Sequence, residues 1–244
     1  MILIRNCTLV LYSLFATLFS YPGRIYLKLK YKDNRERYNK NYYKLKKICR
    51  NIISIIGIEV DMHGQVEEFR RNGSFMYAGN HRSNFDSIIL IACIEQPIIF
   101  IGKDEIRKMP IIGSWFIDIG AIFLKREDIK ASIQVINKGI ECLKTGYSVV
   151  IFPEGKRIKT NKVESFKPGS FKLATKTNSE IIPFSFFNTE EIFERRSYFY
   201  PSKIGLCVAK PINLEKSNLN QTGDVASYVQ RIVSDMYEYM KNSN

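Results

Sequence analysis

Two side chains able to carry acid–base chemistry lie close together in the stretch AGNHRSNFDS, residues 78–87. His81 is one of only two histidines in the 244-residue chain, and Asp86 follows it after four residues. If the two meet, Asp86 accepts a hydrogen bond from one ring nitrogen of His81 and fixes its tautomer. The other ring nitrogen can then take a proton from a hydroxyl group. In the alternative interpretation, Asp86 is an ordinary first-turn carboxylate favoured by the helix dipole, and His81 is a loop residue without a function.

A separation of five residues restricts how this pair can meet. The two side chains point to different sides of a regular helix or strand, so the chain has to turn between them. The flanking sequence predicts such a turn, because residues 74–79 have the pattern of a short buried strand and residues 85–94 that of an apolar helix. Ser83 or Asn84 can cap this helix. The pair is therefore expected at a strand-to-helix junction, where α/β proteins often hold their sites.

Three more charged side chains end or follow predicted strands farther along the chain. Lys103 ends the apolar run PIIFIGK, Arg126 ends AIFLKR, and Glu154 follows YSVVIFP. Because the carboxyl ends of parallel strands meet at one edge of a sheet, we expect these side chains on the same edge as His81. An arginine there can bind a phosphate, and the turn Pro153-Glu154-Gly155 can present backbone amides to a ligand. The ordinary alternatives are a solvated arginine and a surface turn followed by solvated lysines.

The chain beyond its first 58 residues alternates strand-like and helix-like patterns. The strand-like runs are at 74–79, 97–103, 121–126, 147–153, 181–187 and 203–209. The clearest helical patterns cover 127–145 and 224–240, where apolar residues recur every three or four positions. This alternation predicts one α/β domain, residues 59–244, with a mixed, largely parallel sheet flanked by helices. The segment near 58–73 is expected to be a hinge.

The net charge of +13 is concentrated near the N-terminus. Residues 24–50 contain eleven Lys or Arg and two acidic residues, a net charge of +9, which leaves +4 for the rest of the chain. Such a cluster indicates a local anionic partner, either a membrane surface or a nucleic acid. The five cysteines are scattered without CxxC or Cys/His spacing, so they predict neither a zinc site nor a disulfide framework.

Apolar segments on both sides of the basic cluster favour the membrane surface. Residues 6–23 are uncharged and mostly apolar, and a helix of that length spans roughly 27 Å, the lower limit for crossing a bilayer. Residues 42–58 carry an apolar stripe opposite basic residues, which suits a helix in the plane of the interface. We therefore expect residues 1–58 to form a two-helix membrane-anchoring motif. Three alternatives stay open. The segment 42–58 could pack on the main domain, or the segment 6–23 could cross the membrane. The start of the chain could also be a signal peptide, but Leu18 and Ser20 make a poor cleavage site.

Four segments, in this order, resemble the sequence blocks of the 1-acylglycerol-3-phosphate acyltransferases. The first is the His-x4-Asp motif of His81 and Asp86. The second is residues 102–126, similar at Lys103, Pro110, Gly113, Gly120 and Arg126. The third is FPEGKR (152–157), similar to Phe-Pro-Glu-Gly-Thr-Arg-Ser, and the fourth is IIPFSF (181–186). Lys156 and Ile158 stand where the family usually has Thr and Ser, a departure that bears on contacts with the acceptor.

The resemblance implies acyl transfer from an acyl thioester, acyl-CoA or acyl-ACP, to the free glycerol hydroxyl of lysophosphatidic acid, giving phosphatidic acid in phospholipid synthesis. His81 would be the general base, Asp86 would orient it, and Lys103 with a backbone amide would stabilise the oxyanion. The substrate-binding residues would be Arg126, Glu154, Gly155, Lys156 and Arg157, with the cations on the acceptor phosphate. A thioester is already activated, so no serine nucleophile, metal or cofactor is implied.

An acyltransferase for another lysolipid acceptor stays open from the sequence, and so do two other classes of function. A His-Asp hydrolase, such as a thioesterase or phosphoesterase, would use His81 to activate water. A non-catalytic protein that binds membranes or RNA through residues 24–50 would leave the histidine motif without a role. RNA binding would need stacking aromatics, for which the candidates are Tyr31, Tyr38, Tyr42 and Tyr43. The expected partners are a phospholipid membrane, lysophosphatidic acid and the acyl donor rather than nucleic acid, with the domain at the cytoplasmic face of the cell membrane.

Overall fold

A seven-stranded mixed sheet forms the centre of the computed structural model, which describes residues 2–31, 33–109, 111–124, 129–219 and 221–243. The strands are β1 (Glu59–Gly64), β2 (Met76–Gly79), β3 (Ile98–Lys103), β4 (Ile122–Leu124), β5 (Ser148–Ile151), β6 (Ile181–Phe187) and β7 (Lys203–Val208). Their order in the sheet is β1-β7-β6-β2-β5-β3-β4, and neighbouring strands are parallel except β6 and β7. The predicted α/β fold with a largely parallel sheet is confirmed.

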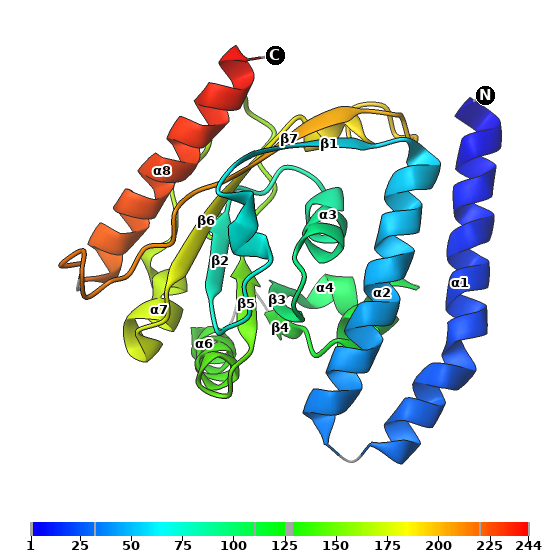
Figure 1. Cartoon of the computed structure of the whole chain (residues 1–244), viewed down its shortest axis with the longest axis horizontal. Coiled ribbons are helices and arrows are strands. Elements are labelled where there is room, and N and C mark those ends of the chain that lie inside the picture. The colour runs from blue at the N-terminus through cyan, green and yellow to red at the C-terminus, as the bar shows by residue number, and fades with distance from the viewer. Residues whose placement is uncertain (1, 32, 110, 125–128, 220, 244) are drawn as a thin grey trace.

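Helices cover both faces of this sheet (Figure 1). They are α1 (Ile2–Lys30), α2 (Asn34–Ile56), α3 (Phe85–Cys93), α4 (Asp104–Arg107), α5 (Ile112–Asp118), α6 (Ile129–Lys144), α7 (Lys172–Thr177) and α8 (Thr222–Asn242). Short 3-10 turns are η1 (Val66–Phe69), η2 (Pro168–Phe171) and η3 (Thr189–Glu191). Helices α6, α7 and α8 lie on one face, α2 and α3 lie on the other, and α1 is outermost beside α2 (Figure 1).

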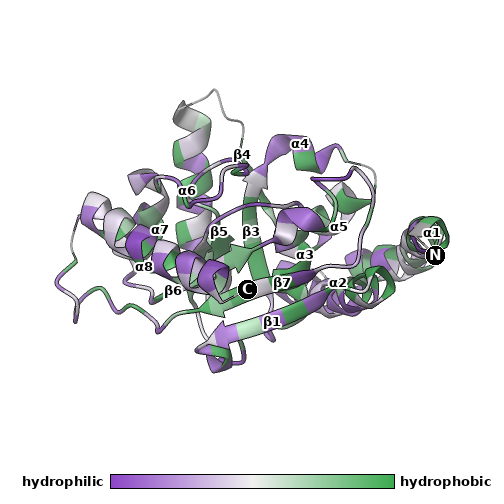
Figure 2. Cartoon of the chain, turned by 90° about the horizontal axis from the view of Figure 1, so that it is seen from above, coloured by the Kyte–Doolittle hydropathy of each residue, from purple (hydrophilic) through white to green (hydrophobic). Residues whose placement is uncertain are grey.

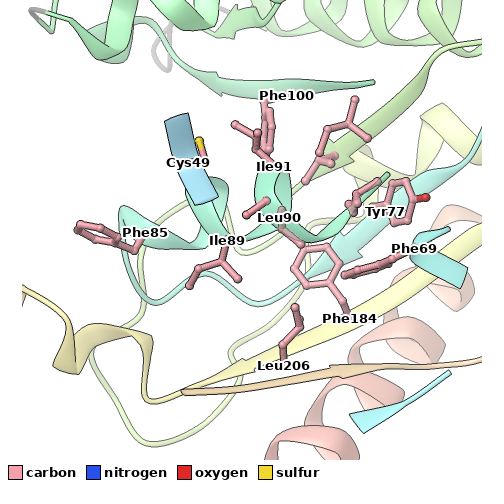
Figure 3. Packing of buried hydrophobic residues seen from close by; sticks show 14 of the residues in the cluster. Cys49, Phe69, Tyr77, Phe85, Ile89, Leu90, Ile91, Phe100, Phe184 and Leu206 are labelled. Atoms are coloured by element: carbon pink, nitrogen blue, oxygen red, sulfur yellow. The ribbon is translucent and has the colours of Figure 1, made fainter. Parts of the chain in front are cut away.

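The core consists of two apolar layers, one on each face of the sheet. On the α3 side, Phe69, Tyr77, Leu90 and Phe184 pack together, as Figure 3 shows. On the α8 side, the neighbour of Tyr77 in β2, Met76, packs against residues of α7 and α8. Because successive side chains of a strand point to opposite faces, a strand covered on both sides must be apolar throughout. This explains the uninterrupted apolar runs that predict the central strands.

The segment near 58–73 is not the expected hinge. Residues Glu59–Gly64 form β1, which pairs in parallel with β7 at the edge of the sheet. Phe69 in the following turn is buried in the core. The sequence EVDMHG contains no apolar run, because an edge strand with partly exposed side chains does not need one. The prediction of a hinge is therefore wrong.

Helix α2 is longer than the segment 42–58 and contains most of the basic cluster. It begins after Asp33, whose carboxylate accepts a hydrogen bond from N of Arg35 at 2.8 Å, and it ends at Gly57 in the left-handed region. Its apolar stripe packs on the main domain, where Leu45 and Cys49 are buried in the core beside α3. The expectation that this stripe lies in the membrane interface is wrong, and packing on the domain is correct.

Helix α1 is attached to the domain on one side and exposes an apolar face on the other. Asn6 exchanges two hydrogen bonds with the backbone of Phe199, at 3.1 and 2.9 Å. Near the other end, Arg24 pairs with Asp118 and lies 4.5 Å from the centre of the Trp115 ring. The exposed large apolar side chains of α1 include Leu3, Val10, Leu11, Leu14, Phe15, Leu18, Phe19 and Leu29. Figure 2 shows α1 at the outside of the molecule, beside α2. By length and composition alone, α1 is apolar enough to cross a membrane.

Candidate active site

His81 and Asp86 lie at the junction between β2 and α3. The backbone turns at residues 80–84 and α3 begins at once, so five residues suffice to bring the side chains together. Nδ1 of His81 is 2.8 Å from Oδ2 of Asp86. Asp86 is completely buried, whereas 21% of the His81 side chain is exposed. The histidine ring is therefore the member of the pair that a substrate can reach.

The carboxylate of Asp86 is surrounded by hydrogen-bond donors. Besides the His81 ring, its Oδ2 accepts hydrogen bonds from the backbone N–H groups of Arg82 at 2.7 Å and Ser83 at 2.9 Å. Its Oδ1 accepts from the hydroxyl of Thr189 at 2.6 Å. Because backbone N–H groups only donate, Oδ2 is an acceptor and Nδ1 of His81 supplies the proton to their bond. The tautomer that fits has its lone pair on Nε2, the nitrogen that can take a proton.

Ser83 supports the start of α3. Its hydroxyl oxygen accepts a hydrogen bond from N of Phe85 at 3.0 Å, and its carbonyl accepts one from N of Asp86 at 3.3 Å. Asn84 occupies the cap position, but its side chain makes no capping hydrogen bond within the described residues. Of the two capping residues that the sequence suggests, Ser83 takes the role.

The ring of His81 stacks on the ring of Phe152, with 4.2 Å between the centroids and 17° between the planes. Phe152 follows β5, the strand beside β2, and its ring meets Phe184 of β6 edge to face at 5.9 Å. A flat apolar surface against one face of the imidazole limits how the ring tilts and keeps water from that face. The first residue of the FPEGKR segment therefore helps to hold the histidine.

Glu154 is buried at the turn after β5, with only 4% of its surface exposed. Its Oε2 accepts a hydrogen bond from the backbone N of His81 at 2.7 Å, and its Oε1 accepts one from N of Glu164 at 3.0 Å. Burial raises the pKa of Glu154 to about 7, although these two backbone hydrogen bonds act to lower it. Both oxygens therefore support the backbone around the histidine. A contact of Glu154 with substrate stays a prediction.

The loop after Glu154 closes against the backbone of the histidine. Gly155 has a φ of +71°, which favours glycine, and a Cβ there would lie 2.8 Å from Nζ of Lys167. Ile158 is buried, and its N–H donates to the carbonyl of His81 at 2.8 Å. The place where the family usually has a serine is thus a core position in this chain.

Arg157 and Lys156 on the same loop face carboxylates and remain partly exposed. Nη1 of Arg157 is 3.2 Å from Oε1 of Glu194, and Nζ of Lys156 is 3.3 Å from Oε2 of Glu164. Exposed ion pairs of this kind contribute little to stability. An anionic ligand can therefore exchange with the carboxylates at small cost.

Lys103 and Arg126 are the other two cations that the sequence predicts at the site. Lys103 is the last residue of β3, half-buried, and in register with Leu124 of β4. It lies on the same sheet edge as His81, with β5 between their two strands. Arg126 lies outside the described residues. The roles of both in binding and catalysis stay predictions.

The sequence does not indicate a role for the segment that follows β6. Residues 189–194 contact the loop 82–86 through Thr189, Glu190 and Glu194. The sequence TEEIFE places three carboxylates shortly after a predicted strand, which could have marked this segment as a candidate. It does not indicate which residues these carboxylates bind. Among the described residues, no group of three His, Cys, Asp or Glu side chains is arranged to hold a metal ion.

Comparison with known proteins identifies the family. The sequence model described as Acyltransferase matches residues 59–186, more than half of the chain. The chain belongs to the acyltransferase family. The matched part of this acyltransferase begins at β1 and ends within β6, so it contains the junction of His81 and Asp86 and the turn at Glu154.

Two curated relatives of this chain are described as 1-acyl-sn-glycerol-3-phosphate acyltransferases. The 1-acyl-sn-glycerol-3-phosphate acyltransferase of Borreliella burgdorferi is 30% identical over 145 residues, which are 59% of this chain and 58% of that protein. The chloroplastic 1-acyl-sn-glycerol-3-phosphate acyltransferase LPAT1 of Arabidopsis thaliana is 32% identical over 146 residues, 59% of this chain and 41% of that protein. This chain thus spans about half the length of these curated relatives.

The fold of this acyltransferase resembles that of a solved structure along its whole length. The crystal structure of the 1-acyl-sn-glycerophosphate (LPA) acyltransferase PlsC from Thermotoga maritima aligns with a TM-score of 0.79 at 26% identity. The alignment covers 99% of this chain and 98% of that chain. The similarity therefore extends over the α1–α2 hairpin, which the family match does not include.

Proposed function

We propose that this acyltransferase transfers an acyl group from an acyl thioester, on coenzyme A or acyl carrier protein, to the free glycerol hydroxyl of lysophosphatidic acid. The observation that carries the proposal is the contact between His81 and Asp86, which leaves Nε2 of the partly exposed ring as a base. The names of the relatives and of the structural neighbour support the choice of acceptor. The product, phosphatidic acid, would enter phospholipid synthesis.

In this mechanism Nε2 of His81 takes the hydroxyl proton while the hydroxyl oxygen attacks the thioester carbonyl carbon. The carbonyl π electrons move to oxygen, and Lys103 with a backbone N–H would stabilise this oxyanion. When the tetrahedral intermediate collapses, the C–S bond breaks and the thiolate takes the proton from the His81 imidazolium. Asp86 stabilises the imidazolium between these steps. The acyl donor is a substrate, and the proposed reaction uses no metal or cofactor.

The acceptor phosphate would bind to Arg157 and Lys156 in the loop after β5, and to Arg126, which lies outside the described residues. For Arg157, the phosphate would replace the carboxylate of Glu194, its partner in this structure. Phosphate and guanidinium form strong charge-assisted hydrogen bonds. Gly155 would also contact the bound acceptor, although its N–H donates to the carbonyl of Phe152 at 3.0 Å in this structure. Glu154 would act mainly by holding the backbone of the histidine.

We also propose that α1 binds the membrane that supplies the acceptor. Its outward apolar face can enter the acyl-chain region, and Lys28 and Lys30 at its end can contact anionic headgroups, at about 1 kcal/mol each. Because its other side is bonded to Phe199 and Asp118, α1 fits a helix lying in the interface better than a separate membrane-crossing helix. The neighbouring basic cluster of residues 24–50 favours an anionic leaflet and a cytoplasmic domain.

Product analysis tests the proposed reaction. The purified full-length protein is incubated with radiolabelled acyl-CoA or acyl-ACP and phosphatidylcholine vesicles that contain lysophosphatidic acid. We expect labelled phosphatidic acid, and much less labelled product when lysophosphatidylcholine, with its phosphate masked by choline, replaces the acceptor. Release of labelled fatty acid at the same rate with and without acceptor would contradict the proposal and indicate a hydrolase. Equal acylation of the choline lipid would contradict the assignment of the acceptor.

A further inference from the structure

The loop that carries His81 and Asp86 is held by a part of the chain outside the family match. The match ends at residue 186, and residues 189–194, which we name the clamp segment, come directly after β6. Asn188 adopts a left-handed conformation with φ of 63°, and the short turn η3 follows it. This reversal keeps the clamp segment at the end of β6, beside the end of β2.

Two carboxylates of the clamp segment bind three consecutive residues of the loop. Glu190 accepts two hydrogen bonds from Arg82, one from Nε at 2.8 Å and one from Nη2 at 2.5 Å. Only 3% of the surface of this arginine is exposed. Glu194 accepts from the hydroxyl of Ser83 and from the backbone N of Asn84, both at 2.8 Å. Two-point contacts fix orientation as well as distance. The clamp segment therefore holds the loop between the histidine and the aspartate through two side chains and one backbone N–H.

The first residue of the clamp segment, Thr189, reaches the catalytic pair itself. Thr189 is completely buried, and its hydroxyl donates to Oδ1 of Asp86 at 2.6 Å. The other oxygen, Oδ2, has the His81 ring and two backbone N–H groups as donors. Within the described residues, the structure gives Oδ1 a single donor, Thr189. A carboxylate held at one oxygen only can rotate about its Cβ–Cγ bond, and this rotation would change the direction of the bond to Nδ1.

We propose that Thr189 is a positioning residue for the proton transfer, because its hydroxyl fixes the plane of the Asp86 carboxylate and thereby the direction of the His81 ring. This inference rests on the proposed role of His81 as the base. Thr189 acts through Asp86 and touches no reacting atom. Its loss should therefore lower kcat and leave the KM values of both substrates nearly unchanged.

Four variants of the full-length protein test the inference. Thr189→Val removes the hydroxyl at similar shape, and Thr189→Ser restores it. Thr175→Val makes the same change at a partly buried hydroxyl of α7 that donates to the backbone carbonyl of Phe171 at 3.2 Å. His81→Ala removes the base. For each, kcat and KM are measured with acyl-CoA and with phosphatidylcholine vesicles containing lysophosphatidic acid, together with the thermal unfolding midpoint.

We expect the Thr189→Val protein to lose roughly 10- to 100-fold in kcat, the loss typical of residues that orient metal-bound histidines from the outer shell, with each KM within about two-fold. The Thr189→Ser and Thr175→Val proteins should stay within about three-fold of the original kcat. Full kcat in Thr189→Val with an inactive His81→Ala would overturn the inference and leave the proposed function standing. Full kcat in His81→Ala would overturn the proposed function. If Thr189→Val does not fold, Thr189→Ala is compared with Thr189→Ser, and equal kcat values overturn the inference.

Discussion

Because the carboxylate of Glu154 is buried, we expect the stability of the protein to depend on pH in an unusual way. The substitution Glu154→Gln should remove this dependence. Glutamine keeps the size of the side chain but cannot ionise. Its amide oxygen can still accept one of the two backbone hydrogen bonds that Glu154 accepts, from His81 and Glu164. Its NH₂ group faces the other donor, so one buried N–H loses its acceptor. This loss costs about 1–3 kcal/mol at any pH.

The ionisation of Glu154 makes a second contribution to the difference in stability between the two proteins, and this one depends on pH. Burial raises the pKa of Glu154 from its ordinary 4.5 to about 7 in the folded protein, so between these values the folded state holds a proton that the unfolded state has released. The stabilisation is complete below pH 4.5 and is lost as the pH rises through 7. The difference in pKa corresponds to roughly 3 kcal/mol, of which about 2–3 kcal/mol is lost between pH 5 and pH 8. The Glu154→Gln variant does not lose stability in this way, because glutamine does not ionise.

Urea unfolding of both proteins across this pH range measures the effect. The single tryptophan, Trp115, is buried and reports the transition by its fluorescence. The free energy of unfolding of the original protein should exceed that of the Glu154→Gln variant near pH 5, and this difference should be about 2–3 kcal/mol smaller near pH 8. Glu238→Gln, at an exposed carboxylate of α8, shows what the substitution does by itself. A difference that stays constant with pH would refute the argument that Glu154 is held in a desolvated site.

Three further perturbations address the chemistry and the membrane. His81→Ala should lower acyl transfer at least 10²- to 10⁴-fold at unchanged circular dichroism, and near-normal turnover would contradict its role as the base. Arg157→Gln should weaken the use of lysophosphatidic acid roughly 10- to 150-fold and the use of monoacylglycerol, which has no phosphate, much less; equal losses would show a structural role. Replacement of Leu18 and Phe19 on α1 by serine should weaken sedimentation with anionic vesicles by about ten-fold or more. The same change at exposed Ile133 of α6 is the control, and equal effects would place the membrane contact elsewhere.

The sheet could be predicted from the sequence where burial determines the residue types. Central strands such as β5 and β6 are covered on both faces, so their apolar runs are long and bounded by turns. The edge strand β1 escapes this reasoning, because its exposed side chains are free to be polar and its partner β7 is far away in the sequence. The apolar stripe of α2 shows a related limit. Its period identifies the face that is buried, but not whether protein or lipid covers it.

The same distinction between local and distant information applies to the site. The contact of His81 with Asp86 could be predicted because it depends on one turn between two recognisable elements. The clamp segment could not, because its bonds join residues between 103 and 111 positions apart. The position of Glu154 after a predicted strand also does not show that its oxygens accept hydrogen bonds from backbone N–H groups, because one donor, N of His81, lies 73 residues away. Only the packed sheet determines these pairings.

The topology explains why the clamp segment can reach the pair at all. Strands β6, β2 and β5 are adjacent and parallel, so Thr189, His81 and Glu154, each shortly after one of these strands, arrive at the same edge of the sheet. A further parallel strand after β6 would need a crossover, which would carry the chain to the opposite edge. Strand β7 is instead antiparallel to β6, with Phe187 opposite Gly205, so the connection of residues 188–202 stays at the edge that holds the histidine. The single reversal of direction in the sheet thus supplies the catalytic loop with its support.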